Sequence, residues 1–142
     1  MPLTDVRHLQ EGLTSGVRIG GLTREQADDP AIRVEVADLF VKHGMIVFED
    51  VEQSDEMQVA VSTIFGPLKE HPVKSLARVD SERMPGVIEL RTKPHSGGVV
   101  EVNGKQLAHW LPWHFDHCYN DELNYAGVLR AVQIVDEGGI TG

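Results

Sequence analysis

The residue types best suited to chemistry in this chain are an imidazole and a carboxylate, His114 and Asp116, separated only by Phe115. On an extended strand, side chains two positions apart point to the same face. The sequence therefore predicts that His114 and Asp116 reach one metal ion from a strand end, while Phe115 packs on the other side. A neutral imidazole with a hard carboxylate suits Fe(II), and two His with one carboxylate form the facial triad of non-haem iron oxygenases. By itself, the H-x-D spacing is a weak signal.

The surroundings of this pair add a second pattern. Trp113 precedes it, and an apolar stretch followed by Gly138-Gly139-Ile140-Thr141 comes after it. Upstream lie an apolar segment, Gly44 to Phe48, a helix end at Phe65-Gly66-Pro67-Leu68, and then His71-Pro72. In their joint order and spacing, these motifs resemble the TauD/TfdA family of Fe(II)- and 2-oxoglutarate-dependent dioxygenases.

The resemblance implies roles for particular residues. His114 and Asp116 correspond to two iron ligands, and Thr141 to the residue that helps bind the 2-oxoglutarate cosubstrate. His71 and Trp113 are expected to contact substrate, although His71 could instead cap a loop or lie exposed. The implied reaction is hydroxylation of a small organic acid, coupled to decarboxylation of 2-oxoglutarate. A sulfonate, an aryloxy acid and a small carboxylic acid are all compatible with the sequence.

Two departures from the family pattern limit this expectation. Family members carry a second His ligand and a cosubstrate-binding Arg after G-G-x-T, so residues 1–142 are expected to be the N-terminal part of a single TauD/TfdA-like domain, with weak or no activity alone. Family members also often have prolines soon after H-x-D, whereas this chain continues HCYNDELNYAG. The alternatives are a non-catalytic or split-enzyme fragment that acts as a binding or assembly module, and a zinc hydrolase on a cupin-like barrel.

Composition restricts the partners and the compartment. The 142 residues suffice for one core, and a net charge of −9 disfavours nucleic acid and anionic membranes. Cys118 is the only cysteine, which excludes an internal disulfide and indicates a reducing compartment. No apolar run approaches a membrane span or a signal peptide. We therefore expect a cytoplasmic protein that binds a small-molecule substrate and that could form homo-oligomers.

The expected elements describe an α+β chain with a mostly β core. A capping box at Thr23 to Gln26 and a second start at Asp28-Asp29-Pro30 precede an amphipathic helix at 31–43, and Ser54 or Asp55 begins a helix that ends near Phe65. Residues 1–16 are expected to be loosely ordered. Strands are expected at 17–21, 45–48, 87–90, 99–102 and 125–135, with a hairpin turn at Asn103-Gly104. Together these elements predict a partial double-stranded β-helix, or jelly roll, with two flanking helices.

The remaining candidate side chains are weaker. His109 and His117 are expected to hydrogen-bond near the site rather than to ligate the metal. Cys118 is interpreted as a buried or half-buried thiol rather than a functional one. His95 is expected at the surface, and Arg130 is expected to be a solvent-facing charge on the last strand.

Overall fold

Three helices form where the sequence supplies their caps. In the computed structural model, Thr23 and Gln26 complete a capping box at the start of α1 (Arg24–Asp28). The carboxylate of Asp29 accepts a hydrogen bond from the Ala31 N–H at 2.8 Å and begins α2 (Pro30–His43). The Ser54 hydroxyl caps α3 (Asp55–Ile64) by accepting from the backbone N–H of Met57 at 3.0 Å. Each cap satisfies an N–H group that has no partner within its own helix.

The structure describes most of the chain but not all of it. The described residues are 3–71, 76, 78–91, 99–108, 114, 116, 121–134 and 136. They belong to two compact units, Met1–Leu68 with Ala126–Gly142 and Lys69–Tyr125, here named the helical unit and the hairpin unit. Within the described residues, no helix is long and apolar enough to cross a membrane.

The helical unit contains a three-stranded sheet. Its central strand is β2 (Val17–Gly20), which pairs antiparallel with β1 (Val6–His8) and parallel with β3 (Ile46–Glu49). Because α1 and α2 lie between β2 and β3 in the chain, they form the crossover that a parallel pair requires. Strand β1 was not expected, since residues 1–16 carry no long apolar alternation.

The core of the helical unit lies between this sheet and the helices. Ile19 of β2 is fully buried, as are Ile32 and Val36 of α2 to within 2% exposure. The other buried members of the cluster are Leu22, Ala27, Met57 and Val61, and Val128 packs against it from the last part of the chain. The helices α2 and α3 therefore contribute Ile32, Val36, Met57 and Val61 to this core.

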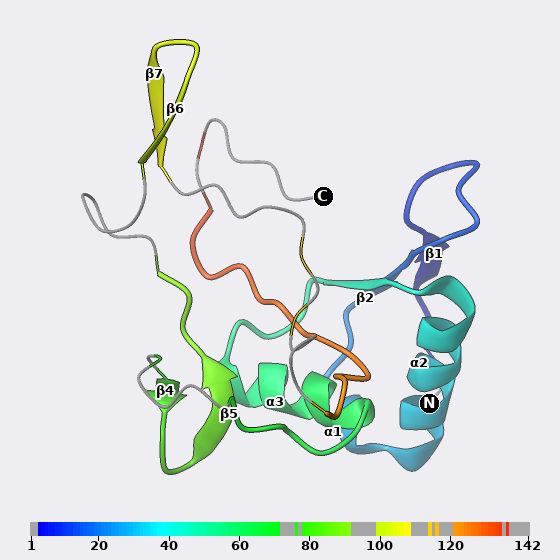
Figure 1. The fold of residues 1–142 in the computed structure, drawn as a ribbon. Coiled ribbons are helices and arrows are strands. Elements are labelled where there is room, and N and C mark those ends of the chain that lie inside the picture. The colour runs from blue at the N-terminus through cyan, green and yellow to red at the C-terminus, as the bar shows by residue number, and fades with distance from the viewer. Residues whose placement is uncertain are drawn as a thin grey trace. The chain divides into compact units, whose positions relative to one another are not determined.

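The hairpin unit contains two separate two-stranded sheets. Strands β4 (Arg78–Asp80) and β5 (Met84–Ile88) pair antiparallel, as do β6 (Val99–Val102) and β7 (Lys105–Ala108) (Figure 1). The β6–β7 turn has Asn103 at φ 53° and Gly104 at φ 74°. Positive φ at both positions is the type I′ geometry that an Asn-Gly pair favours, so the expected hairpin is confirmed.

Several expectations about strands were wrong. Residues 125–134 form no strand or helix, although the run is rich in β-branched side chains. The strand expected at 87–90 begins earlier, at Met84, and ends at Ile88. The described residues thus form a mixed α+β structure with three helices, rather than two, and three small sheets.

Candidate functional site

His114 and Asp116 lie together in the hairpin unit. The Nε2 atom of His114 is 3.1 Å from the Oδ1 atom of Asp116, and the two side chains are 52% and 75% exposed. Neither residue belongs to a strand, and Asp116 lies in a turn. The expectation of a shared strand face was therefore wrong in its secondary structure, while the two side chains do meet. Phe115 lies outside the described residues.

The spacing of these two atoms fits a shared metal ion. Ligand atoms about 2.1 Å from a metal, at neighbouring positions about 90° apart, are about 3.0 Å from each other. The observed 3.1 Å agrees with that separation. The same distance also suits a hydrogen bond between an imidazole N–H and a carboxylate. An imidazole nitrogen and a carboxylate oxygen are two of the three donors of the Fe(II) facial triad.

A third protein ligand is not seen in the described part of the chain, where no group of three His, Cys, Asp or Glu side chains could hold a metal. His109 and His117, which were expected to hydrogen-bond near the pair, lie outside the described residues, and so does Cys118. Trp113 and Thr141 lie outside them as well, so their expected substrate and cosubstrate roles stay predictions. His95, which was expected at the surface, also lies outside the described residues.

His71 is a half-buried member of the hairpin unit, in a connection without helix or strand. Its backbone carbonyl accepts a hydrogen bond from Nη2 of Arg78 at 3.2 Å. The Arg78 side chain is only 8% exposed. No sequence signal distinguishes Arg78, because a single arginine in a polar stretch looks like an ordinary surface charge.

The Asp80 carboxylate organises the turn between β4 and β5. It accepts hydrogen bonds from the backbone N–H groups of Arg83, at 2.8 Å, and Glu82, at 3.0 Å. The bond from Arg83 is the main reason that the pKa of Asp80 lies below its ordinary value of 3.8. Because the shift comes mainly from backbone N–H groups of the same turn, the lowered pKa marks a local turn rather than a catalytic acid or base.

Most arginines in the chain already contact protein oxygens. Arg7 and Arg18 both pair with the carboxylate of Glu49. The side chain of Arg33 donates to the backbone carbonyls of Ala27 and Thr63. Arg24, Arg78, Arg91 and Arg130 also have carboxylate or carbonyl partners. A cosubstrate carboxylate would have to displace one of these partners, which argues against these seven as its binding arginine.

Arg130 differs from expectation. Instead of facing solvent, it is 20% exposed and forms an ion pair with Asp55 at the start of α3. Its Nε atom donates to the Gln58 side chain at 3.1 Å. Val128, two residues earlier, packs on the core. Half-buried and exposed side chains therefore alternate along this segment, as in a strand, although it pairs with no strand in the described structure. Arg130 therefore attaches the last part of the chain to α3.

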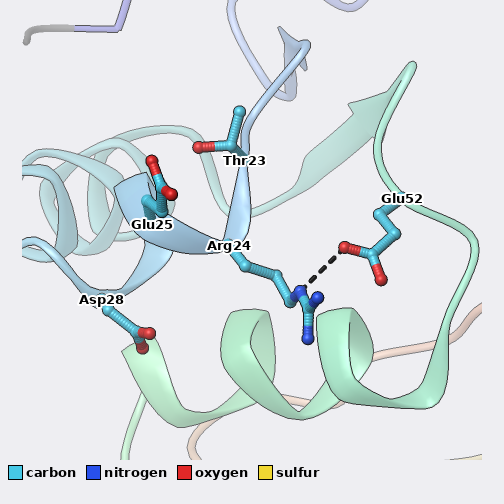
Figure 2. Close-up of a pocket in the computed structure, with 5 residues that line it drawn as sticks. All are labelled: Thr23, Arg24, Glu25, Asp28 and Glu52. Carbon is cyan, nitrogen blue, oxygen red and sulfur yellow. Dashed lines mark ion pairs between the residues drawn. The ribbon is translucent and has the colours of Figure 1, made fainter.

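An open groove in the helical unit has different chemistry. Its volume is about 490 Å³, and its lining residues are Thr23, Arg24, Glu25, Asp28 and Glu52. Figure 2 shows the guanidinium of Arg24 directed at Glu52, and the Nε–Oε2 distance is 2.8 Å. The groove could hold a small molecule by size, but it contains no imidazole and its one cation is already paired. It is therefore a poor candidate for the iron or cosubstrate site.

The comparison with protein families agrees with the order of motifs in the sequence. No solved structure matches the chain significantly. The family model described as taurine catabolism dioxygenase TauD, TfdA family matches residues 5–142. This range includes the elements of both units and the His114–Asp116 pair, and the chain belongs to the TauD/TfdA family.

Proposed function

We propose that this chain provides part of the active site of an Fe(II)- and 2-oxoglutarate-dependent dioxygenase that hydroxylates a small organic acid. The observation that carries the proposal is the 3.1 Å separation of His114 Nε2 and Asp116 Oδ1, in a chain that matches the dioxygenase family over residues 5–142. We further propose that residues 1–142 belong to one domain of the jelly-roll type, as the family resemblance implies.

In this proposal, His114 and Asp116 hold Fe(II) from a turn. Bound iron, with 2-oxoglutarate and O2, would supply the oxidising chemistry: the cosubstrate is decarboxylated to succinate and a substrate C–H bond is hydroxylated. Thr141 donates its hydroxyl to the cosubstrate carboxylate, and His71 and Trp113 contact the substrate. The exposed carboxylate of Asp116 leaves the site open to water and metal ions, so enclosure must come from other parts of the site.

Two protein ligands hold a metal less firmly than the three of a facial triad. We therefore expect His114 and Asp116 by themselves to hold a metal weakly, and coupled succinate formation to need a further protein ligand.

Metal titration tests the pair directly. Co(II) is titrated into the unaltered chain, His114→Ala and Asp116→Ala, with the exposed His8→Ala and Asp121→Ala as matched controls that remove the same chemical groups elsewhere. Removing either proposed ligand should weaken binding about tenfold or more, by analogy with the loss seen for outer residues of metal sites, while the controls bind as before. Equal binding by all five proteins would remove the site and favour the non-catalytic binding module.

The role of Thr141 needs the complete set of family residues. In such a protein, Thr141→Ala should raise the 2-oxoglutarate requirement about ten- to a hundredfold, since a hydrogen bond to a charged group contributes about 1.5–3 kcal/mol. Asp116→Ala should abolish turnover. Succinate formation is measured against 2-oxoglutarate concentration. If Thr141→Ala leaves that dependence unchanged, the assignment of the G-G-x-T motif is wrong.

A further inference from the structure

Arg78 is the most enclosed charged side chain of the hairpin unit for which the structure gives an exposure, at 8%. Its Nε atom donates to the backbone carbonyl of Pro85, its Nη1 atom to that of Leu76 and its Nη2 atom to that of His71, each at 3.2 Å. The Glu70 carboxylate lies 3.8 Å from Nη2. One guanidinium thus connects strand β5 with two points of the connection that precedes β4.

These contacts replace secondary structure where the chain has none. Glu70, His71 and Leu76 lie in no helix or strand, and the guanidinium of Arg78 contacts the carboxylate of Glu70 and the backbone carbonyls of the other two. A guanidinium carries five N–H donors in a fixed plane and can satisfy several carbonyls at once, whereas a lysine ammonium is a single compact centre. Because the donors of Arg78 already face protein oxygens, this arginine is suited to fixing the backbone rather than to binding an anionic ligand.

We propose that Arg78 is a positioning residue of the active site: by holding the backbone carbonyl of His71, it fixes the backbone position from which the His71 imidazole reaches substrate at the proposed metal site. This inference rests on the proposed function, because His71 contacts substrate only if His114 and Asp116 hold the metal. Arg78 itself contacts no substrate. Its effect passes through the backbone of His71, so the geometry of its donors matters as well as its charge.

The test compares Arg78→Lys and Arg78→Gln with Arg91→Gln, a matched control at an exposed arginine of the same unit. Each protein is titrated with Co(II), and the paramagnetic shift of the His71 imidazole protons is followed by NMR. We expect Co(II) affinity to stay within about twofold in all variants, since ligands unchanged by the substitution set it. The His71 shift should change or broaden in both Arg78 variants, including the charge-conserving one, and stay unchanged in Arg91→Gln.

The outcomes separate the two proposals. If the unaltered chain fails to bind Co(II), the proposed function fails, and the active-site role of Arg78 fails with it. If Co(II) binds and the His71 shift is the same in Arg78→Lys, Arg78→Gln and the unaltered chain, the positioning role alone is overturned.

A measurement on the unaltered chain covers the case in which the Arg78 variants do not fold. The backbone amide of His71 should be as rigid as those of β5, with an order parameter of about 0.85. A value below about 0.6 would show that Arg78 does not fix this backbone, and it would overturn the inference without any substitution.

Discussion

The ion pair between Arg130 and Asp55 gives the most direct test of how the last part of the chain is held. We consider Arg130→Met, which keeps a long apolar side chain but removes the guanidinium. It loses the ion pair with Asp55 and the 3.1 Å hydrogen bond to Gln58. Bonds to charged groups contribute about 1.5–3 kcal/mol when buried, and exposed ion pairs contribute about 0–1 kcal/mol. With exposures of 20% and 31%, this pair lies between those limits.

We therefore expect Arg130→Met to lower the free energy of unfolding by about 1–2 kcal/mol. Removing Arg130 leaves the carboxylate of Asp55 without this ion pair. The free-energy cost stays small because Asp55 lies in the first turn of α3, where the helix dipole stabilises a negative charge. Urea denaturation of Arg130→Met, Asp55→Asn and the double variant gives the coupling energy of the pair. The same cycle on the exposed pair of Arg91 and Glu89 is the control, with an expected coupling of about 0.5 kcal/mol or less. A coupling between Arg130 and Asp55 below about 0.3 kcal/mol would contradict the reasoning.

Three further substitutions probe the core, a turn and the response to acid. Ile19→Ala removes a fully buried side chain and should cost about 2–5 kcal/mol in urea denaturation; a loss below 1 kcal/mol would mean that β2 is not central to the core. Gly104→Ala forces a side chain into positive φ, so amide exchange of the β6–β7 hairpin should accelerate about fivefold, for a strain of about 1 kcal/mol; unchanged exchange would argue against the type I′ turn. The folded-state pKa of Asp80 is lowered, so its stabilisation is complete above about pH 4 and is lost as the pH falls through the folded pKa. Asp80→Ala should therefore make the β4–β5 turn less sensitive to acid, as followed by NMR between pH 6 and pH 2. An identical acid transition in Asp80→Ala and in the unaltered chain would show that Asp80 does not stabilise this turn.

The elements that could be predicted from sequence are those with local signals. The caps at Thr23, Asp29 and Ser54 each involve a side chain and a backbone N–H two or three residues away. The turn at Asn103-Gly104 depends on the φ preferences of two adjacent residues. Such signals are complete within a few positions, so the sequence is enough to locate them.

The elements that could not be predicted depend on distant partners. Strand β1 exists because Val6, Arg7 and His8 pair with β2, about ten residues later. Residues 125–134 have strand-like composition, yet within the described structure no strand pairs with them. Strand propensity describes how well a residue fits a sheet that is already present. Val128 and Arg130 are half-buried and Leu129 between them is exposed, as in a strand with one buried face. Within the described residues, however, no neighbouring strand forms hydrogen bonds with this segment.

The candidate site shows the same division. A spacing of two residues brings His114 Nε2 and Asp116 Oδ1 within 3.1 Å outside any strand, although a strand was expected. The separation of their ligand atoms is thus a local property that different backbone conformations can produce. The hydrogen bond to the backbone carbonyl of His71 is different, because its donor is an arginine seven residues away that also contacts β5. A two-residue motif can consequently identify where a metal would bind, whereas the contacts that Arg78 makes with the His71 backbone and with β5 join separate parts of the chain, which no short motif records.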